Sequence, residues 1–208
     1  AFVMTSIVGE AINTFGTEDQ KERYLKPMVT DTKIPEEALT EARGGSDFFG
    51  ATTRAVPDGD FFILNGQKRF VVGAEAADFF AVYCNTNPKA PTHERISVFI
   101  VDKGPGVEVE HVYGLLGCRG TGVGRLVFRN CRVPKENLVG KLGDGAIIFD
   151  RMMIPERLTS GAASVGGGRA ALEIAIRYSD RRNVEMDAMG IDAQKEKIYT
   201  DEDMWRNF

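Results

Sequence analysis

Apolar residues recur every three or four positions at the start of the chain, and this spacing predicts one apolar helical face over residues 1–13. A second helix is predicted from Thr17, because Thr17 and Gln20 have the spacing of a capping box. Pro27 is expected to end that helix near Leu25, since proline cannot donate a helical hydrogen bond. The chain therefore opens with two helices.

The pattern changes to strands from residue 51. Short segments rich in β-branched and aromatic residues alternate with turn signals, and Asp58-Gly59 and Asn65-Gly66 stand where two-residue hairpin turns need a positive φ. Such spacing favours an antiparallel barrel or two packed sheets between about residues 37 and 135. The predicted strands are residues 51–56, 61–64, 67–72, 79–84, 96–101, 107–112, 125–128 and 131–133.

The pattern becomes helical again after residue 138. Residues 145–154 are apolar, and Pro155 either begins a new helix or kinks a continuing one. A long helix is predicted over residues 156–178. Residues 183–208, which include Trp205, are polar and acidic, and they predict a weakly packed helix without chemistry.

Composition excludes several classes of function. The chain has 208 residues, 43% of them hydrophobic, so it can bury a core in one or two domains. A net charge of −4 without any basic run argues against nucleic acid as a partner. No apolar run is long enough to span a bilayer, and the first residues lack a signal-peptide layout.

Cysteines and histidines give no sign of a metal site. Cys84, Cys118 and Cys131 are odd in number and far apart, so we expect reduced and mostly buried thiols in a cytosol-like compartment. His93 and His111 have no partner at catalytic spacing, so we expect them at the surface or at a sheet edge.

The stretch 39–46, Leu-Thr-Glu-Ala-Arg-Gly-Gly-Ser, holds the candidate chemistry. Gly44 and Gly45 let backbone N–H groups approach a phosphate or a flat ring, and the hydroxyls of Thr40 and Ser46 add donors. The same residues also describe an ordinary turn, so the motif alone leaves both interpretations open.

An ordered set of motifs, of which this stretch is one, resembles the acyl-CoA dehydrogenases, flavoenzymes that desaturate acyl-CoA thioesters. The resemblance runs from about residue 17 to 182, and no single motif is diagnostic. Its members are Thr40-Glu41, Gly45-Ser46-Asp47, Asp58-Gly59-Asp60, Asn65-Gly66-Gln67-Lys68, Val133-Pro134-Lys135-Glu136-Asn137 and Pro155-Glu156-Arg157.

The resemblance implies an α+β fold, with an antiparallel β-barrel or sandwich domain flanked by α-helices. Residues 1–36 would then end an N-terminal helical domain, 37–140 would form the middle β-barrel domain, and 141–208 would start a C-terminal helical domain. Because family members are longer at both ends, we expect this chain to be a piece of the fold.

By the same resemblance the cofactor is FAD, lying against the barrel, since a hydride acceptor must come from a cofactor. Leu39 and Thr40 would meet the edge of the flavin ring. Gly45 and Ser46 would meet the pyrophosphate, and Ser46 would also lie close to the CoA arm.

Residues 70–72 are a departure from the family pattern. Phe70, Val71 and Val72 stand where relatives usually carry Trp-Ile followed by Thr or Ser beside the flavin. Val72 keeps a backbone N–H for the ring but lacks the hydroxyl, which would change the flavin's reduction potential or indicate a different hydride partner. The alternative is that these three residues are only barrel core.

A base for the α-proton is implied at one of two positions. Glu156 matches a family glutamate on the first helix after the barrel; other members use a glutamate in a later part that this chain does not contain. Near a helix start, Glu156 can also be an ion-paired surface residue. Arg157 would order the site, and Arg182 would reach FAD phosphates of another subunit, although residues 184–186 depart from the family pattern there.

The resemblance therefore implies FAD-dependent α,β-dehydrogenation of an acyl-CoA in fatty acid metabolism, with electrons passed to an electron-transfer flavoprotein. It implies a homo-oligomer, a dimer or a tetramer, in the cytoplasm or, in a eukaryote, the mitochondrial matrix. The isolated chain lacks regions that would supply much of the pocket. An acyl-CoA oxidase-type flavoenzyme and a truncated, non-catalytic relative that binds acyl-CoA or a partner protein are the alternatives.

Overall fold

The computed structural model of the chain describes residues 2–188, and the side chains of residues 4–182. The chain divides into two compact units, Ala1–Arg157 and Leu158–Phe208. The predictions for Trp205 and for the acidic residues after 188 lie outside the described part.

Four short helical segments open the first unit. The capping box is confirmed: Thr17 Oγ1 accepts from Gln20 N at 3.2 Å, and Gln20 Oε1 accepts from Thr17 N at 3.1 Å. The predicted stop at Pro27 is wrong, because Pro27 lies in the first turn of a further helix and the preceding turn widens into a π-helix. The segments are α1 (Phe2–Phe15), α2 (Glu18–Gln20), the π-helix η1 (Lys21–Leu25) and α3 (Lys26–Val29).

Eight strands form one mixed sheet in the order β6-β7-β3-β2-β4-β5-β8, with β1 paired to β4 off this path. Short 3-10 segments η2 (Phe48–Gly50), η3 (Thr92–Glu94), η4 (Arg119–Thr121) and η5 (Lys135–Asn137) lie between strands. The strands are β1 (Pro35–Ala38), β2 (Arg54–Asp58), β3 (Phe61–Val71), β4 (Phe79–Asn85), β5 (Ile96–Asp102), β6 (Val107–Val112), β7 (Gly124–Pro134) and β8 (Leu138–Val139).

The α+β class, with a mostly antiparallel sheet and flanking helices, is confirmed, but the sheet is not a closed barrel. Its ladder ends at β6 on one side and β8 on the other. Two pairings are parallel: β1 with β4, and a bridge from Arg54 to Asn85. Both have the same cause, since β4 follows β1 and β2 through a crossover and not through a hairpin.

Asn65-Gly66 is not a hairpin turn as predicted, because β3 runs straight through it. The register with β7 shifts there, from Leu64 opposite Cys131 to Gly66 opposite Phe128, which is a β-bulge. Asn65 Oδ1 accepts from the backbone N–H of Asn130 at 2.8 Å, so two distant asparagines pin the irregularity. The segments predicted at 125–128 and 131–133 are accordingly one strand, β7.

The Asp58-Gly59 turn is confirmed. Asp58 pairs with Phe61, and Gly59 has the positive φ of +57° that the two-residue loop requires.

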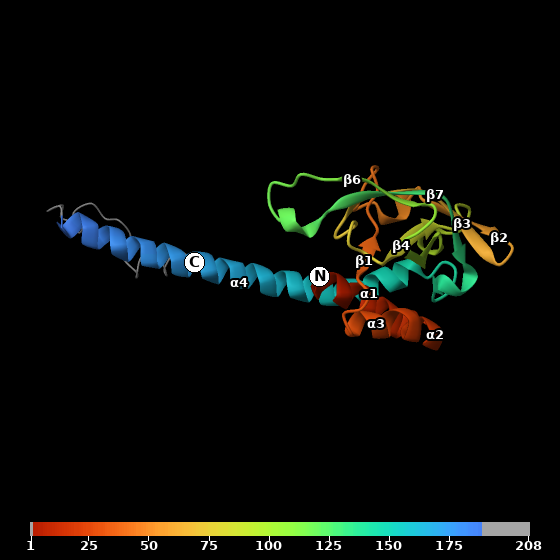
Figure 1. Ribbon diagram of the computed structural model, residues 1–208, viewed down its shortest axis with the longest axis horizontal. Helices are drawn as coiled ribbons and strands as arrows, with labels where there is room; N and C mark the ends of the chain where they lie inside the picture. The colour runs from red at the N-terminus through yellow and green to blue at the C-terminus, as the bar shows by residue number, and fades with distance from the viewer. Residues whose placement is uncertain (1, 189–208) are drawn as a thin grey trace. The chain divides into compact units, whose positions relative to one another are not determined.

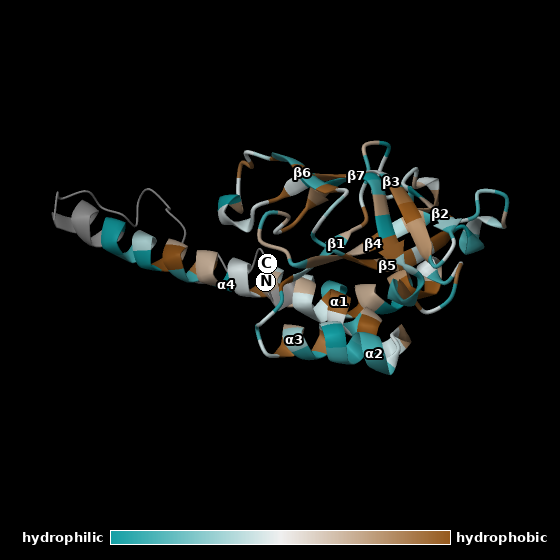
Figure 2. Ribbon diagram, turned by 45° about the vertical axis from the view of Figure 1, so that its right-hand side comes forward, coloured by the Kyte–Doolittle hydropathy of each residue, from teal (hydrophilic) through white to brown (hydrophobic). Residues whose placement is uncertain are grey.

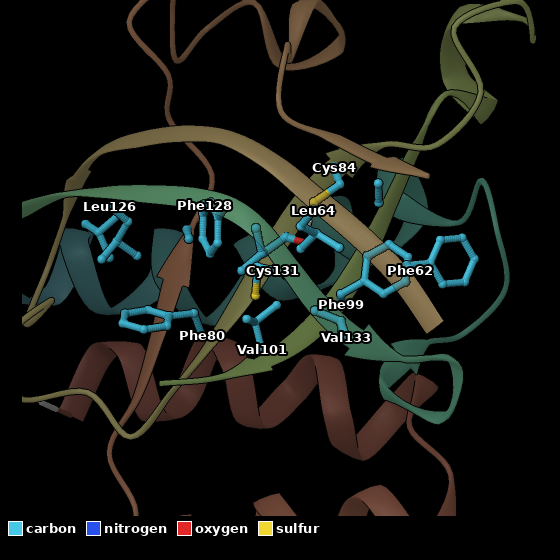
Figure 3. Close-up of a cluster of buried hydrophobic side chains, with 14 of the residues drawn as sticks. Phe62, Leu64, Phe80, Cys84, Phe99, Val101, Leu126, Phe128, Cys131 and Val133 are labelled. Atoms are coloured by element: carbon cyan, nitrogen blue, oxygen red, sulfur yellow. Dashed lines mark hydrogen bonds between the residues drawn. The ribbon is translucent and has the colours of Figure 1, made fainter. Parts of the chain in front are cut away.

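Two hydrophobic clusters lie on opposite faces of β4 and β5, whose side chains alternate between them. In the first cluster β3 and β7 fold over β4 and β5: Figure 3 shows Leu126 and Phe128 facing Phe80 and Val101. The rings of Phe62 and Phe99 lie 4.9 Å apart in this layer. β4 and β5 are accordingly among the most hydrophobic ribbons in Figure 2.

The second cluster joins the sheet to the helical segments, which lie along one side of it in Figure 1. Polar contacts fix the same interface. The amide of Gln20, which is fully buried, donates to the carbonyl oxygens of Glu136 at 2.7 Å and Leu138 at 2.8 Å. Tyr24 donates to Asp102 at 2.7 Å.

The helix α4 (Gly145–Ala188) contains Pro155 inside it, so Pro155 does not begin a new helix. Within the first unit its buried residues Ile148 and Met152 join the second cluster. Residues 158–188 belong to the second unit.

The cysteines are mostly buried and the histidines lie at the surface, as expected from the sequence. Cys84 and Cys131 are buried and Cys118 is exposed, and all three are free thiols. His93 and His111 are exposed, and His111 lies on the edge strand β6. None of the described helices is long and apolar enough to cross a membrane, and the described residues hold no metal-binding cluster of three or more His, Cys, Asp or Glu.

Candidate functional site

A cavity of about 280 Å³ lies within the first unit, where the end of β1, the end of β3, α1 and the first turns of α4 meet. Half of its lining residues were named from the sequence as site residues: Leu39, Thr40, Phe70, Val72 and Glu156. The other lining residues are Met4, Glu37, Arg69, Phe149 and Met153. The cavity thus has apolar walls, one hydroxyl, one guanidinium and two carboxyl groups.

Phe70 faces the cavity because the strand is irregular at this point. Its φ is +56°, which is uncommon for a residue with a side chain, and the register of β3 with β7 shifts between Lys68 and Val71. The Phe70 ring is 53% exposed and lies 4.9 Å from the ring of Tyr113, whose hydroxyl accepts from Arg69 Nε at 3.2 Å. An aromatic surface is therefore held open to a ligand.

Val71 has the opposite orientation. Its side chain is 1% exposed and belongs to the first hydrophobic cluster, where β3 and β7 fold over β4 and β5. Of the three residues 70–72, only Phe70 and Val72 line the cavity.

The glycine loop begins at the cavity and leads away from it. Glu41 and Gly44 form a tight bridge, with backbone hydrogen bonds of 3.3 and 3.2 Å. A Cβ at Gly45 would lie 3.4 Å from both the methyl and the hydroxyl of Thr40, so this glycine packs closely against a cavity residue. Gly45 and Ser46 are exposed and do not line the cavity, so their predicted role concerns a ligand that extends beyond it.

A buried ion pair between Lys68 and Glu41 fixes the start of this loop. Lys68 Nζ lies 2.8 Å from Glu41 Oε1 and donates to the carbonyl oxygen of Leu39 at 3.0 Å. The second oxygen, Glu41 Oε2, accepts from Thr52 N and Oγ1, both at 2.6 Å, and Thr53 N donates to Oε1 at 3.0 Å. Burial alone would raise the pKa of Glu41, but Lys68 and Thr52 outweigh it and lower that pKa to about 2.

Glu37 is the opposite case. Its Oε1 is buried and accepts no hydrogen bond from the described residues. Burial, and next the charge of Glu156, raise the pKa of Glu37 to about 7, against a smaller lowering by Lys68. The neighbouring Glu36 is 3% exposed, and burial raises its pKa to about 8.

Glu37 was not identified from the sequence as a site residue, although a signal was present. Glu36 and Glu37 are consecutive in a strand, and successive strand residues point to opposite faces. Because both faces of the sheet are covered here, both carboxyl groups turn inward. Two consecutive acidic residues directly before the apolar residues 38–39 therefore indicate a strand that is covered on both faces.

Glu156 lines the cavity from α4 and is partly buried. Its neighbour Arg157 is exposed and lies outside the lining. Arg182 lies on α4 in the second unit. The roles assigned to these three residues stay predictions; only Glu156 faces the cavity.

Comparison with known families matches two adjoining parts of the chain. The family model "Acyl-CoA dehydrogenase, N-terminal domain" matches residues 1–32, and "Acyl-CoA dehydrogenase, middle domain" matches residues 37–131. Together the two matches cover more than half of the chain.

Individual relatives agree with this match. The chain is 38% identical to the Caffeyl-CoA reductase-Etf complex subunit CarC of Acetobacterium woodii over 85% of this chain and 47% of that protein. It superposes on butyryl-CoA dehydrogenase of Megasphaera elsdenii with a TM-score of 0.81 and 34% identity, covering 85% of this chain and 46% of that one. An FAD complex of PigA matches with a TM-score of 0.70 and 31% identity, over 73% of this chain and 40% of that one.

The chain thus spans about half the length of the curated relatives it matches. The same domains match in sequence, in fold and in chain order. The chain belongs to the acyl-CoA dehydrogenase family.

Proposed function

We propose that this chain takes part in FAD-dependent α,β-dehydrogenation of an acyl-CoA thioester, with electrons passed on to an electron-transfer flavoprotein. One observation supports this most directly: Glu156 shares a cavity with Thr40, Phe70 and Val72, the residues expected beside a flavin. A base and a cofactor surface that meet in one cavity are what removal of two hydrogens from adjacent carbons requires.

Glu156 acts as the base in this proposal. A carboxylate positioned beside the α-carbon of a bound thioester can take its proton as a general base. Met153 and Phe149, one and two turns before it on α4, supply apolar surface in the same cavity. Glu156 is the only member of the Pro155-Glu156-Arg157 motif in the lining.

The residues present fit a flavin. The half-exposed ring of Phe70 offers a flat apolar surface, and the Thr40 hydroxyl offers a hydrogen-bonding group beside it. Leu39 and Val72 close the apolar wall. A bound flavin supplies the hydride acceptor that no side chain can provide.

The glycine loop suits the diphosphate of the same cofactor. Gly45 packs on Thr40, and the loop that carries Gly45 and Ser46 is exposed immediately outside the cavity. In this proposal Ser46 and Arg157 also contact the CoA part of the substrate. Arg182 contacts FAD phosphates of a second subunit, which requires a homo-oligomer.

The proposal is tested by mixing the purified chain with FAD and recording its visible spectrum before and after anaerobic addition of an acyl-CoA. The expected result is retained yellow colour, followed by bleaching. Glu156→Gln should keep the colour, but its rate of bleaching should fall by a factor of about 10² or more, because general base catalysis contributes that much to the rate.

Asp150→Asn is the matched control, since Asp150 is an exposed carboxylate on the same helix outside the cavity. It should bleach like the unaltered chain. Bleaching that survives Glu156→Gln would exclude Glu156 as the base. A chain that stays colourless with FAD would instead favour a non-catalytic relative, and rapid reoxidation by oxygen alone would favour the oxidase alternative.

A further inference from the structure

Glu37 is a partly buried residue that the proposed reaction does not yet use. Its carboxyl lines the cavity, and Oε1 is enclosed without any hydrogen-bond partner among the described residues. Buried polar atoms in folded proteins are nearly always paired, because an unpaired one costs about 1–3 kcal/mol. Because Glu37 lines the cavity and no described residue bonds this oxygen, a molecule bound in the cavity can supply the hydrogen-bond partner of the carboxyl group.

Charged and titratable groups act on Glu37 from three elements, α4, β3 and β4. Glu156 of α4 shares the cavity with it, and Arg69 of β3 lies at the same wall. Lys68 of β3 acts on Glu37 from a distance, but its Nζ is engaged by Glu41 and Leu39. Tyr83 of β4 is fully buried, and its hydroxyl donates to the sulfur of Met152.

Burial and these neighbouring charges determine the protonation state of Glu37. Lys68 is held by another carboxylate, whereas Glu156 brings a second negative charge into the cavity. Two carboxylates in one apolar site do not both ionise readily, so one of them keeps a proton. A ligand that fills the cavity removes more water and favours the neutral form of Glu37 further.

We propose that Glu37 is a neutral hydrogen-bond donor in this cavity, which offers its carboxylic proton to a carbonyl oxygen of the bound ligand. This rests on the proposed function, which supplies two such oxygens: the thioester carbonyl of the acyl-CoA and a ring carbonyl of the flavin. Both have the same acceptor chemistry, and the experiment below separates them.

The thioester carbonyl would gain the most from such a donor. When the α-carbon loses its proton, the C–H bond breaks, a new O–H bond forms on Glu156, and the electron pair spreads onto the thioester oxygen. A preorganised neutral donor stabilises that developing charge without giving up its own proton. Glu37 keeps its O–H bond throughout, so the step is balanced.

The first measurement needs no ligand. In chain labelled with ¹³C at the glutamate carboxyls, the Glu37 signal is assigned as the one lost in Glu37→Gln and followed by NMR as a function of pH. The expected midpoint for Glu37 is a pKa of about 7. Glu156→Gln should lower this midpoint because it removes the neighbouring negative charge, and Asp150→Asn should leave it unchanged.

Titration of Glu37 in the ordinary carboxylate range would overturn the proposal, whatever the ligands do. A midpoint that Glu156→Gln does not move would overturn it as well, because the two carboxyl groups would then not share a cavity.

The second measurement uses calorimetry to compare Glu37→Gln, which keeps a neutral donor, with Glu37→Leu, which has none. The probes are FAD alone, butyryl-CoA added to the FAD-loaded chain, and the butyl thioether of CoA, which lacks the carbonyl oxygen. If the thioester is the acceptor, Glu37→Leu should bind butyryl-CoA about tenfold more weakly than the unaltered chain does, whereas Glu37→Gln should bind it about as well. The thioether, which has no carbonyl oxygen, should bind to all three proteins about equally.

If the flavin carbonyl is the acceptor, Glu37→Leu should weaken FAD binding instead. Equal binding of every probe to all three proteins would overturn the proposal. Stronger binding to Glu37→Leu than to the unaltered chain would overturn it too. A chain that binds no FAD would count against the proposed function, while the titration would still decide whether Glu37 is neutral.

Discussion

Glu37 and Glu41 lie four residues apart on the same stretch of chain, and their surroundings drive their pKa values in opposite directions. Glu41 has Lys68 and Thr52 as partners and its pKa falls to about 2, whereas Glu37 has an unpaired oxygen and its pKa rises to about 7. Both carboxyl groups have lost water, so burial is common to both. The presence of fixed partners makes the difference, and only the site without them has room for a ligand.

The largest effect is expected when the buried ion pair is broken. Lys68→Met should destabilise the chain by about 3–5 kcal/mol, because it leaves Glu41 charged and buried without its cation. Unfolding in denaturant measures the loss. Adding Glu41→Gln to Lys68→Met should recover much of it, since the unpaired charge is then gone.

Lys26→Met is the matched control for this variant. The Lys26–Glu22 pair has the same 2.8 Å separation, but both side chains are about 70% exposed, so its loss should leave the free energy of unfolding nearly unchanged. A comparable loss in both variants would show that distance matters more than burial.

A second effect should appear as a dependence of stability on pH. The pKa of Glu36 is raised from 4.5 to about 8 in the folded chain, so its contribution is complete below about pH 4.5 and is lost as pH rises through 8. Glu41 behaves in the opposite way: its contribution is present above about pH 4.5 and is lost as pH falls toward 2. Stability should therefore be greatest near pH 4.5.

Glu36→Gln should flatten the alkaline side of this curve. Relative to the unaltered chain, its stability should increase between pH 5 and 8 by on the order of 2–4 kcal/mol, as thermal or denaturant unfolding would show. Glu94→Gln, which alters an exposed carboxylate, should follow the unaltered chain. If Glu36→Gln also followed it, a buried and protonated Glu36 would be ruled out.

The smallest effect concerns one of the partners of Glu41. Thr52→Ala removes the hydroxyl that donates to Glu41 Oε2 at 2.6 Å and should cost about 1 kcal/mol, measured by denaturant unfolding. Thr52→Ser keeps the hydroxyl and should restore most of the loss. Equal losses in the two variants would point to the methyl group and away from the hydrogen bond.

Local sequence patterns predicted the elements whose partners are near in the chain. The capping box of Thr17 and Gln20 and the hairpin at Asp58-Gly59 are complete within a few residues, and both are present. Asn65-Gly66 has the same local signal as a hairpin, but a residue 65 positions later, Asn130, turns it into a bulge. Sequence neighbours alone do not contain that information.

In the candidate site too, local motifs predicted some residues, and the tertiary fold decides the others. Thr40, Phe70, Val72 and Glu156 were named from motifs and meet in one cavity. Met153 was not named, because an apolar helix face looks the same whether it meets a core or a cavity. The tertiary fold decides this, and it also decides that Lys68 is fully buried beside Glu41.

The buried amide of Gln20 has a consequence for how the first unit unfolds. Both of its N–H groups donate to carbonyl groups at β8, that of Glu136 just before the strand and that of Leu138 within it, 116 and 118 residues further along the chain. Opening the short helix α2 would leave these carbonyl groups without their donor, and detaching β8 would leave the Gln20 amide without its acceptors. The helical layer and the sheet should therefore open together as one cooperative unit, with amide protons in both protected against exchange to a similar degree.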